Sequence, residues 1–226
     1  GVQTCALPIW SLGCEQLFYF LFPFLALFFA KKQKLIGALL VCAVVVPVLM
    51  SMTDEANIRG YWYVNPLARF PDFLVGMLLY RVYEWCRSKK LSFSTASLLE
   101  VGAVCIFLLF YMFSADLVPK VYRYSCYYWM PISLVLLIFS LQKGFLSRIL
   151  SNKYLVIGGD ISYSFYLIHL WILFAYVQLA QTYDWHISLY ISIPLIFAVT
   201  IGLSLLSYYY FEKPANRWVK RILNKQ

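Results

Sequence analysis

Charged residues are scarce in this chain. Only 13% of its 226 residues are Asp, Glu, Lys or Arg, whereas a soluble domain carries about 25%. Hydrophobic residues make up 62%, and the mean hydropathy is +0.72. These values exclude an ordinary soluble domain. Because apolar stretches long enough to cross a bilayer recur along the chain, the sequence predicts an all-α, polytopic bundle of membrane helices.

Patterns that hold metals or bind nucleic acids are also lacking. The six cysteines stand singly, with no CxxC or CxxH spacing, which favours small buried hydrophobes over metal ligands or disulfides. The net charge of +9 could suggest nucleic acid. The Lys and Arg residues, however, form short clusters between apolar runs, without the interleaved aromatic residues of a binding groove. We therefore expect no metal and no nucleic acid, and we find no internal repeat or low-complexity linker.

Residues 1–9 lack the features of a natural N-terminus. They contain no initiating Met and no signal-peptide pattern. Their sequence, GVQTCALPI, resembles the translated reading frame of a common sequencing-library adapter. We expect these nine residues to be an artefact and the natural chain to extend upstream of Trp10. A coding sequence that runs smoothly upstream without an adapter match would contradict this expectation.

Seven membrane spans can be drawn from the apolar runs, which makes residues 10–212 a transmembrane domain and 213–226 a basic tail. A polar, aromatic loop (53–65) separates the second span from the third, and the stretch 145–149 is expected to lie along the membrane surface. The predicted spans are residues 15–30, 35–52, 66–83, 95–113, 127–141, 161–180 and 188–211.

Basic residues are distributed unevenly between the two sides of these spans. Fifteen of the 19 Lys and Arg residues fall on the side of the tail, and four fall on the other side. Basic loops face the cytoplasm in membrane proteins. The C-terminus is therefore expected to be cytoplasmic, and Trp10 is expected to lie at the outer face.

The stretch from Trp10 to Phe22 carries a polar seam into an apolar run. On a helix, Ser11, Glu15 and Tyr19 share one face because they are four residues apart. A polar seam leading into hydrocarbon is costly unless a polar group meets it. The alternative interpretation is that Glu15 marks the water boundary of the span and Trp10 is an interfacial anchor.

Two further sets of polar residues belong to the predicted spans. One lies at the outer end of the third span, and the other lies along the sixth. Arg69 and Asp72, three residues apart, are expected to pair, either as a site or as a structural ion pair. Ser162, Tyr166 and His169 share one face, and His169 would lie roughly 13 Å into its span. An ionisable group at that depth is a functional candidate, although a neutral His bonded between helices is the alternative.

Glu212 stands where the last span meets the basic side, followed by Pro214, which helps to stop a helix. An interfacial stop signal is the simpler interpretation here, and a role in a site is the other. Asp160 or Ser162 is expected to cap the sixth span.

The order of four motifs resembles the acyltransferase 3 family of integral-membrane acyltransferases, often O-acetyltransferases of lipopolysaccharide, exopolysaccharide and other surface glycans. The resemblance covers the chain after residue 9. The motifs are Trp10-Ser11-Leu12-x-x-Glu15-x-x-Phe18-Tyr19, Arg69-x-x-Asp72-Phe73-Leu74-x-Gly76, Ile161-Ser162-Tyr163-Ser164-Phe165-Tyr166-Leu167-x-His169 and Tyr210-Phe211-Glu212-Lys213-Pro214.

Three departures from the family pattern matter. Gln16 and Leu17 replace Glu and Gln in the first motif, and Asp72 stands where Glu is commoner. The family's proposed catalytic His lies in its first membrane helix, ahead of every residue present here, so neither His169 nor His186 corresponds to it. The resemblance therefore leaves the catalytic residue upstream and implies that this chain alone is inactive.

The resemblance implies transfer of an acyl group, usually acetyl, from acyl-CoA to a hydroxyl of a cell-surface carbohydrate or lipid-linked glycan in the bacterial plasma membrane. Acyl-CoA is then a substrate, no cofactor is bound, and membrane lipids surround the protein. Glu15 and Arg69 are expected to be acceptor-side or structural polar groups, and His169 a hydrogen bonder in helix packing. The inner-side cations that would suit the phosphates of CoA are Arg81, Arg87, Lys89, Lys90 and Lys153.

Two rival classes can be compared with this interpretation. A transporter or flippase of lipid-linked sugars would show inverted repeats and helices interrupted at corresponding positions of two halves, and neither pattern occurs. An unrelated type of membrane-bound O-acyltransferase is disfavoured because no His-Asn pairing occurs.

Overall fold

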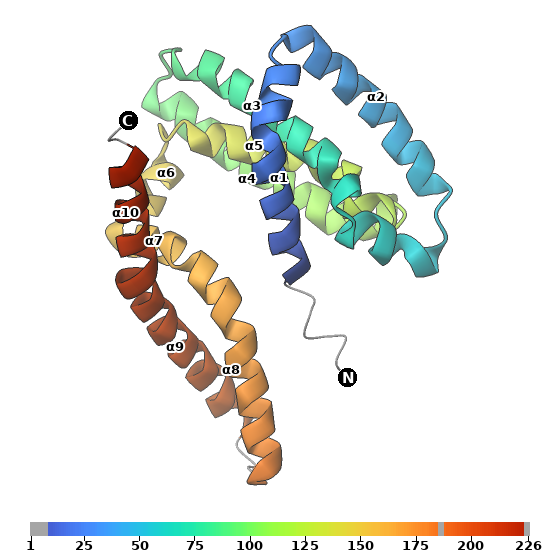
Figure 1. The fold of residues 1–226 in the computed structure, drawn as a ribbon. Helices are drawn as coiled ribbons and strands as arrows, with labels where there is room; N and C mark the ends of the chain where they lie inside the picture. The colour runs from blue at the N-terminus through green and yellow to red at the C-terminus, as the bar shows by residue number, and fades with distance from the viewer. Residues whose placement is uncertain (1–8, 185–187, 224–226) are drawn as a thin grey trace. The chain divides into compact units, whose positions relative to one another are not determined.

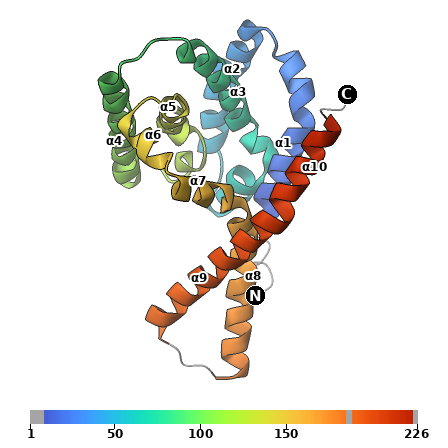
Figure 2. The same cartoon turned by 90° about the vertical axis from the view of Figure 1, so that its left-hand side faces the viewer.

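The structure is a computed structural model that describes residues 9–184 and 188–223. It does not describe the side chains of residues 9–11, 55 and 223. All regular structure in the described part is helical, as the sequence predicts, and there is no strand among those residues. The chain divides into two compact units, residues 9–150 and 151–226, which we describe separately (Figures 1 and 2).

The first unit contains six α-helices linked by short turns. Residues 53–65, predicted to be a loop, instead form mostly a 3-10 turn (Glu55–Asn57) and a π turn (Arg59–Val64), followed by the 3-10 turn η4 (Pro66–Arg69). The α-helices are α1 (Ile9–Phe28), α2 (Lys32–Ser51), α3 (Phe70–Arg87), α4 (Phe93–Leu117), α5 (Trp129–Ser140) and α6 (Phe145–Leu150).

Helices α1, α2 and α3 share a small apolar core around Phe29, Leu35 and Leu74, each at most 5% exposed. A second core lies further along α2, where Val46 and Met50 pack with Trp62. The Trp62 indole N–H donates to the Thr53 hydroxyl at 2.9 Å. This bond fixes the π turn Arg59–Val64 to the residues that follow α2. These cores are small because most apolar side chains face outward, as expected for helices in lipid.

Long basic side chains close two helix ends in this unit. Arg81 of α3 donates from Nη2 to the carbonyls of Phe29 (2.6 Å) and Ala30 (3.0 Å), just where α1 stops. Lys143 donates to the carbonyls of Arg87 (3.3 Å) and Lys89 (2.8 Å) at the end of α3. Cations suit these positions because the last carbonyls of a helix lack partners and carry partial negative charge.

The second unit is built on the antiparallel pair α8 (Ser162–Thr182) and α9 (Leu189–Ser207). The Phe165 and Phe197 rings meet at 5.6 Å, and the Tyr176 hydroxyl bonds that of Ser192. The short helix α7 (Lys153–Asp160) precedes α8, while the π turn η7 (Tyr208–Glu212) and α10 (Lys213–Leu223) follow α9. The prediction that Asp160 or Ser162 caps α8 is wrong. Ile161 occupies the N-cap position, and no side chain bonds the free N–H groups at the start of this helix.

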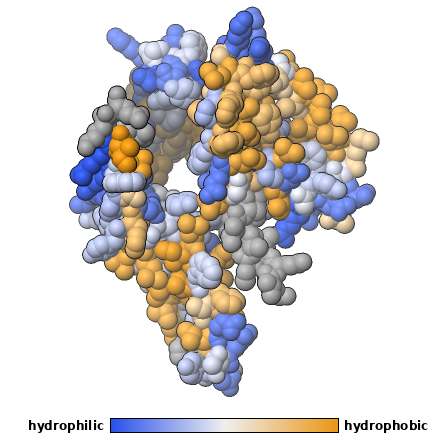
Figure 3. All heavy atoms as spheres, in the orientation of Figure 1, coloured by the Kyte–Doolittle hydropathy of each residue, from blue (hydrophilic) through white to orange (hydrophobic). Residues whose placement is uncertain are grey.

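Each of the seven predicted spans contains a helix, but the count of seven is not clearly supported. Within the described residues, four helical stretches are long and apolar enough to cross a membrane: 32–51, 93–117, 162–182 and 189–222. The last of these joins α9, η7 and most of α10, and the 19 residues of α9 are themselves long enough to span. Leu12–Phe28 and Cys126–Ser140 are shorter apolar helices. The 12 residues of α5 extend only about 18 Å, well short of a hydrocarbon core of about 30 Å. Hydrophobic side chains cover the visible face of α2 and much of α8 and α9 (Figure 3).

Candidate functional site

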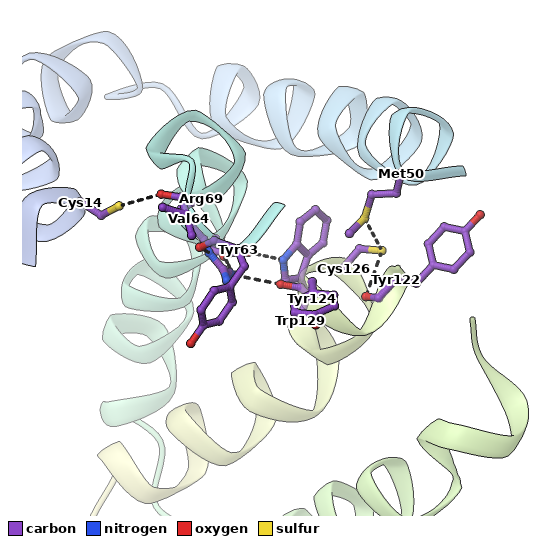
Figure 4. Close-up of polar contacts among 10 residues, drawn as sticks. Cys14, Met50, Tyr63, Val64, Arg69, Tyr122, Tyr124, Cys126 and Trp129 are labelled. Atoms are coloured by element: carbon purple, nitrogen blue, oxygen red, sulfur yellow. Dashed lines mark hydrogen bonds and ion pairs between the residues drawn. The ribbon is translucent and has the colours of Figure 1, made fainter. Parts of the chain in front are cut away.

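Four residues of the first unit form a connected polar group, the Arg69 cluster: Arg69, Asp72, Tyr124 and Trp129. Figure 4 labels three of them, Arg69, Tyr124 and Trp129. Arg69 Nη1 donates to Asp72 Oδ2 at 3.1 Å, which confirms the predicted pairing, and also to the Tyr124 carbonyl at 3.0 Å. The Trp129 indole N–H donates to Asp72 Oδ1 at 2.5 Å. Each carboxylate oxygen of Asp72 therefore accepts one hydrogen bond. The donors are Arg69, three residues away in the sequence, and Trp129, 57 residues away.

The backbone around Arg69 is fixed by its own sequence. Asn65 caps η4 by accepting from the Leu67 amide at 2.9 Å, and Pro66 supplies the preset φ of a first helical residue. The Tyr63 ring lies 5.4 Å from the Arg69 guanidinium carbon and meets the Tyr124 ring edge-on. Arg69 is consequently held by an aromatic face, a carboxylate and a carbonyl.

Arg69 keeps one edge for a further partner. Its Nη1 makes the two strong bonds and its Nε a long one of 3.4 Å to the Tyr63 carbonyl. No described residue bonds to Nη2. The Arg69 side chain is 21% exposed and that of Asp72 is 33% exposed, so the cluster is partly shielded yet reachable.

Two buried polar atoms lack hydrogen-bond partners among the described residues. They are Arg123 Nε and Ser125 Oγ, and they belong to the sequence neighbours of Tyr124, whose carbonyl accepts from Arg69. Buried polar groups are almost always satisfied, and an unsatisfied one leaves a desolvation cost of about 1–3 kcal/mol. The segment 123–125 therefore contains one backbone carbonyl that binds Arg69 and two buried side-chain atoms without partners.

A hollow of about 670 Å³ opens in the same unit, beside the end of α2 and the turn before α3. This volume is within the range of small-molecule pockets, roughly 300–1,000 Å³. The rings of Tyr61 and Trp62 line it together with the polar side chains of Asp54, Asn57 and Asn65. It shares the segment 65–72 with the Arg69 cluster, because Ala68 and Pro71 also line it.

The polar seam predicted on α1 does not meet a polar partner in the described part of the first unit. Glu15 is exposed, and Tyr19 is 72% exposed; the side chain of Ser11 lies outside the described part. The adjacent face of α1 makes the contacts instead. The Cys14 thiol lies 3.9 Å from the Val64 carbonyl, and Phe18 stacks on Phe73 at 4.9 Å.

In the second unit, the three residues predicted to share a face of α8 have different surroundings. Tyr166 and His169 do meet, with ring centroids 5.9 Å apart, while Ser162 is exposed. His169 Nδ1 lies 3.2 Å from the Phe165 carbonyl of its own helix, and its ring stacks on Phe165. This hydrogen bond lies within α8 and does not join two helices. His186 lies outside the described residues.

Glu212 contacts a serine that the sequence analysis did not single out. Its carboxylate is hydrogen-bonded to the Ser164 hydroxyl, which also lies 3.0 Å from the Ser207 hydroxyl. Tyr208 donates to Asp160 at 2.9 Å. Ser164 is 3% exposed. These bonds fasten η7 to the start of α8, so Glu212 has a structural partner rather than a free edge.

Glu100 is a second group that the sequence analysis missed. It is 1% exposed, and its carboxylate accepts from the amides of Gly144 (3.1 Å), Leu146 (2.8 Å) and Ser147 (3.3 Å) and from the Ser147 hydroxyl. A single Glu in an apolar helix is itself a signal. Because donors surround this carboxylate, it anchors α6 to α4.

No group of three or more His, Cys, Asp or Glu side chains with metal-binding geometry occurs among the residues that the structure describes. The Arg69 cluster is a connected polar group of the first unit that is partly exposed. A guanidinium fixed on a carboxylate, with a free edge, can bind a carbonyl or phosphate oxygen.

Comparison with known proteins gives one informative result. No curated protein and no solved structure matches the chain. A family model described as an acyltransferase domain matches residues 2–209, which is most of the 226 residues. The match spans both units and includes the Arg69 cluster. The chain therefore belongs to the acyltransferase 3 family.

Proposed function

We propose that this protein transfers an acyl group, acetyl in the first instance, from acyl-CoA to a hydroxyl of a cell-surface carbohydrate or lipid-linked glycan. Membership of the acyltransferase 3 family supports the reaction class. The observation that carries the proposal is the unused Nη2 edge of Arg69, whose side chain is 21% exposed and already fixed by Asp72 and the Tyr124 carbonyl. This is a place where a polar ligand would complete the hydrogen bonding.

The chemistry requires a donor where negative charge develops. The acceptor oxygen attacks the thioester carbonyl carbon, its proton passes to a general base, and the C–S bond breaks to release the CoA thiol. The carbonyl oxygen becomes negative on the way, and a fixed cationic donor stabilises it. Arg69, on the acceptor side, suits the orientation of the acceptor hydroxyl, because Asp72 and the Tyr124 carbonyl already hold its guanidinium in place. The family resemblance assigns the general base to a His, and neither His169 nor His186 corresponds to it.

The hollow beside the cluster supports a hydroxyl-rich acceptor. Sugar rings present an apolar C–H face that stacks on aromatic rings, and hydroxyls that both donate and accept. Tyr61 and Trp62 provide rings, while Asp54 and Asn57 are exposed polar side chains in the same hollow. The small number of basic residues on this side supports an extracellular position for the hollow, with the C-terminus in the cytoplasm and the protein in a bacterial plasma membrane.

We assign the acyl-CoA donor to the basic inner side, where two of the five expected cations have other partners. Arg81 is occupied by the two carbonyls at the end of α1, and Arg87 pairs with Glu84 at 2.8 Å. Lys89 and Lys90, at the end of α3, keep side-chain N–H groups for the phosphates of CoA.

The proposal is tested by measuring acyl transfer in membranes that contain the full-length protein. Vesicles are supplied with acetyl-CoA labelled in the acetyl group, and label is counted in the glycan fraction as ester that mild alkali releases. We expect Arg69→Lys to lower the rate at least tenfold, because a lysine cannot keep both partners and a free donor edge. Arg59→Lys is the matched control: Arg59 is exposed on the same side and should leave the rate unchanged.

Two results would overturn the proposal. One is an Arg69→Lys protein that remains folded and monodisperse and transfers acetyl at the wild-type rate. The other is a wild-type protein that moves lipid-linked sugar across the bilayer without labelling any glycan, which is the behaviour of a flippase.

A further inference from the structure

The final helix, α10 (Lys213–Leu223), separates its basic and apolar residues more sharply than any other helix described here. At 100° per residue, its four cations fall within about a third of the helix circumference. Its apolar residues occupy the opposite side. The basic stripe is Lys213, Arg217, Lys220 and Arg221, and the apolar stripe contains Trp218, Val219 and Ile222.

The position of α10 along the chain puts it at the membrane surface. The 19 residues of α9 extend about 28 Å, which matches a hydrocarbon core of about 30 Å. The π turn η7 follows, with Tyr208, Tyr209 and Tyr210, residues suited to the interface, and then Glu212. Helix α10 therefore begins where the hydrocarbon ends.

Neither stripe of α10 has a protein partner in its unit. Trp218 is 65% exposed, and Val219 and Ile222 are 45% and 47% exposed. Lys213 lies 5.2 Å from the Tyr209 ring centre. The three cations after Lys213 form no ion pair with any residue that the structure describes.

We propose that α10 docks on a bilayer surface rich in anionic phospholipid. Phosphodiester headgroups complement the basic stripe, and the apolar stripe, with Trp218 at its centre, enters the boundary between headgroups and acyl chains. The axis changes direction between α9 and α10 (Figure 1), and the π turn between them is a suitable place for a further bend. The proposal does not depend on the acyltransferase activity.

The experiment measures amide hydrogen exchange of residues 213–222 in the intact protein reconstituted in lipid nanodiscs. One preparation contains phosphatidylcholine alone, and the other contains about one-third phosphatidylglycerol. We expect slower exchange with phosphatidylglycerol, and loss of that protection in 0.5 M NaCl, because salt screens the charges.

Two variants give the size of the effect. Each basic residue near an anionic surface changes the docking equilibrium by about fivefold, so Arg217→Gln with Lys220→Gln should raise the exchange rate with phosphatidylglycerol by an order of magnitude or more. The matched control is Lys31→Gln with Lys32→Gln, which removes the same charge at the start of α2 and should not alter exchange in α10. Trp218→Ala should also speed exchange.

Equal exchange in the two lipid mixtures would overturn the proposal. Protection that persists in an uncharged detergent without phospholipid would also overturn it, because a protein surface would then be the partner of α10.

Discussion

Among the described glycines, Gly144 is the one at which an added methyl group meets neighbouring atoms within 4 Å. A Cβ on Gly144 would lie 2.3 Å from both Cδ and Oε2 of Glu100 and 2.5 Å from Oε1. Contacts below 3.0 Å essentially never occur for real Cβ atoms, so one group must move. The Glu100 carboxylate cannot swing toward solvent cheaply, because it is 1% exposed and accepts four hydrogen bonds.

The cost of Gly144→Ala follows from the bonds that this movement breaks. Hydrogen bonds to a charged group contribute about 1.5–3 kcal/mol each, so losing two of the four destabilises the unit by roughly 3–6 kcal/mol. For a chain of this length, the melting temperature should fall by roughly 10 °C. The assay is thermal unfolding in detergent, followed by the loss of the monodisperse peak in size-exclusion chromatography.

A control and a rescue make this prediction specific. Gly102→Ala, in α4, adds a methyl group that meets nothing within 4 Å and should be neutral or slightly stabilising. Glu100→Asp in the Gly144→Ala background shortens the acid by one methylene and should recover part of the lost stability. If Gly144→Ala melts within about 2 °C of the wild type, the close approach of Gly144 to Glu100 is wrong.

Three further substitutions test other contacts by thermal unfolding. Trp129→Phe keeps a ring but removes the N–H donor to Asp72, and should destabilise by about 1.5–3 kcal/mol; no change would mean that this bond is absent. Ser164→Ala removes the hydroxyl that holds Glu212 and should destabilise by about 1 kcal/mol or more, and a gain in stability would contradict the contact. Lys143→Met removes exposed bonds to two carbonyls at the end of α3 and should cost less than about 1 kcal/mol; a larger loss would show that we underestimate this cap.

The positions of the helices could be predicted because the apolar runs are long and basic clusters separate them. The residues at which each helix begins and ends could not be predicted from the sequence. The expected span at 127–141 became the 12-residue α5 after two 3-10 turns, Tyr122–Tyr124 and Cys126–Tyr128. The expected loop at 53–65 coils into 3-10 and π turns, because short helical turns leave too little periodicity to detect.

The candidate site was predictable only where its residues are close in sequence. The pairing of Arg69 with Asp72 follows from their spacing of three. The bond of Trp129 to Asp72 spans 57 residues and depends on tertiary packing, so no local pattern indicates it. The face of α8 that meets η7 carries Ser164 rather than Ser162, since spacing shows which residues share a face but not which face meets a neighbour.

The long sequence separation between Glu100 and its partners has a consequence for how the chain is made. A ribosome that adds roughly 5–20 residues per second needs about 2–9 s to produce the 44 residues between Glu100 and Gly144. During that interval the carboxylate has no amide donors from α6. Its place seven residues after the first residue of α4, about 10 Å along the helix, keeps it within reach of the headgroup region. Helix α4 can thus enter the bilayer with its acid near water, and the later arrival of residues 144–147 draws that acid into the folded unit.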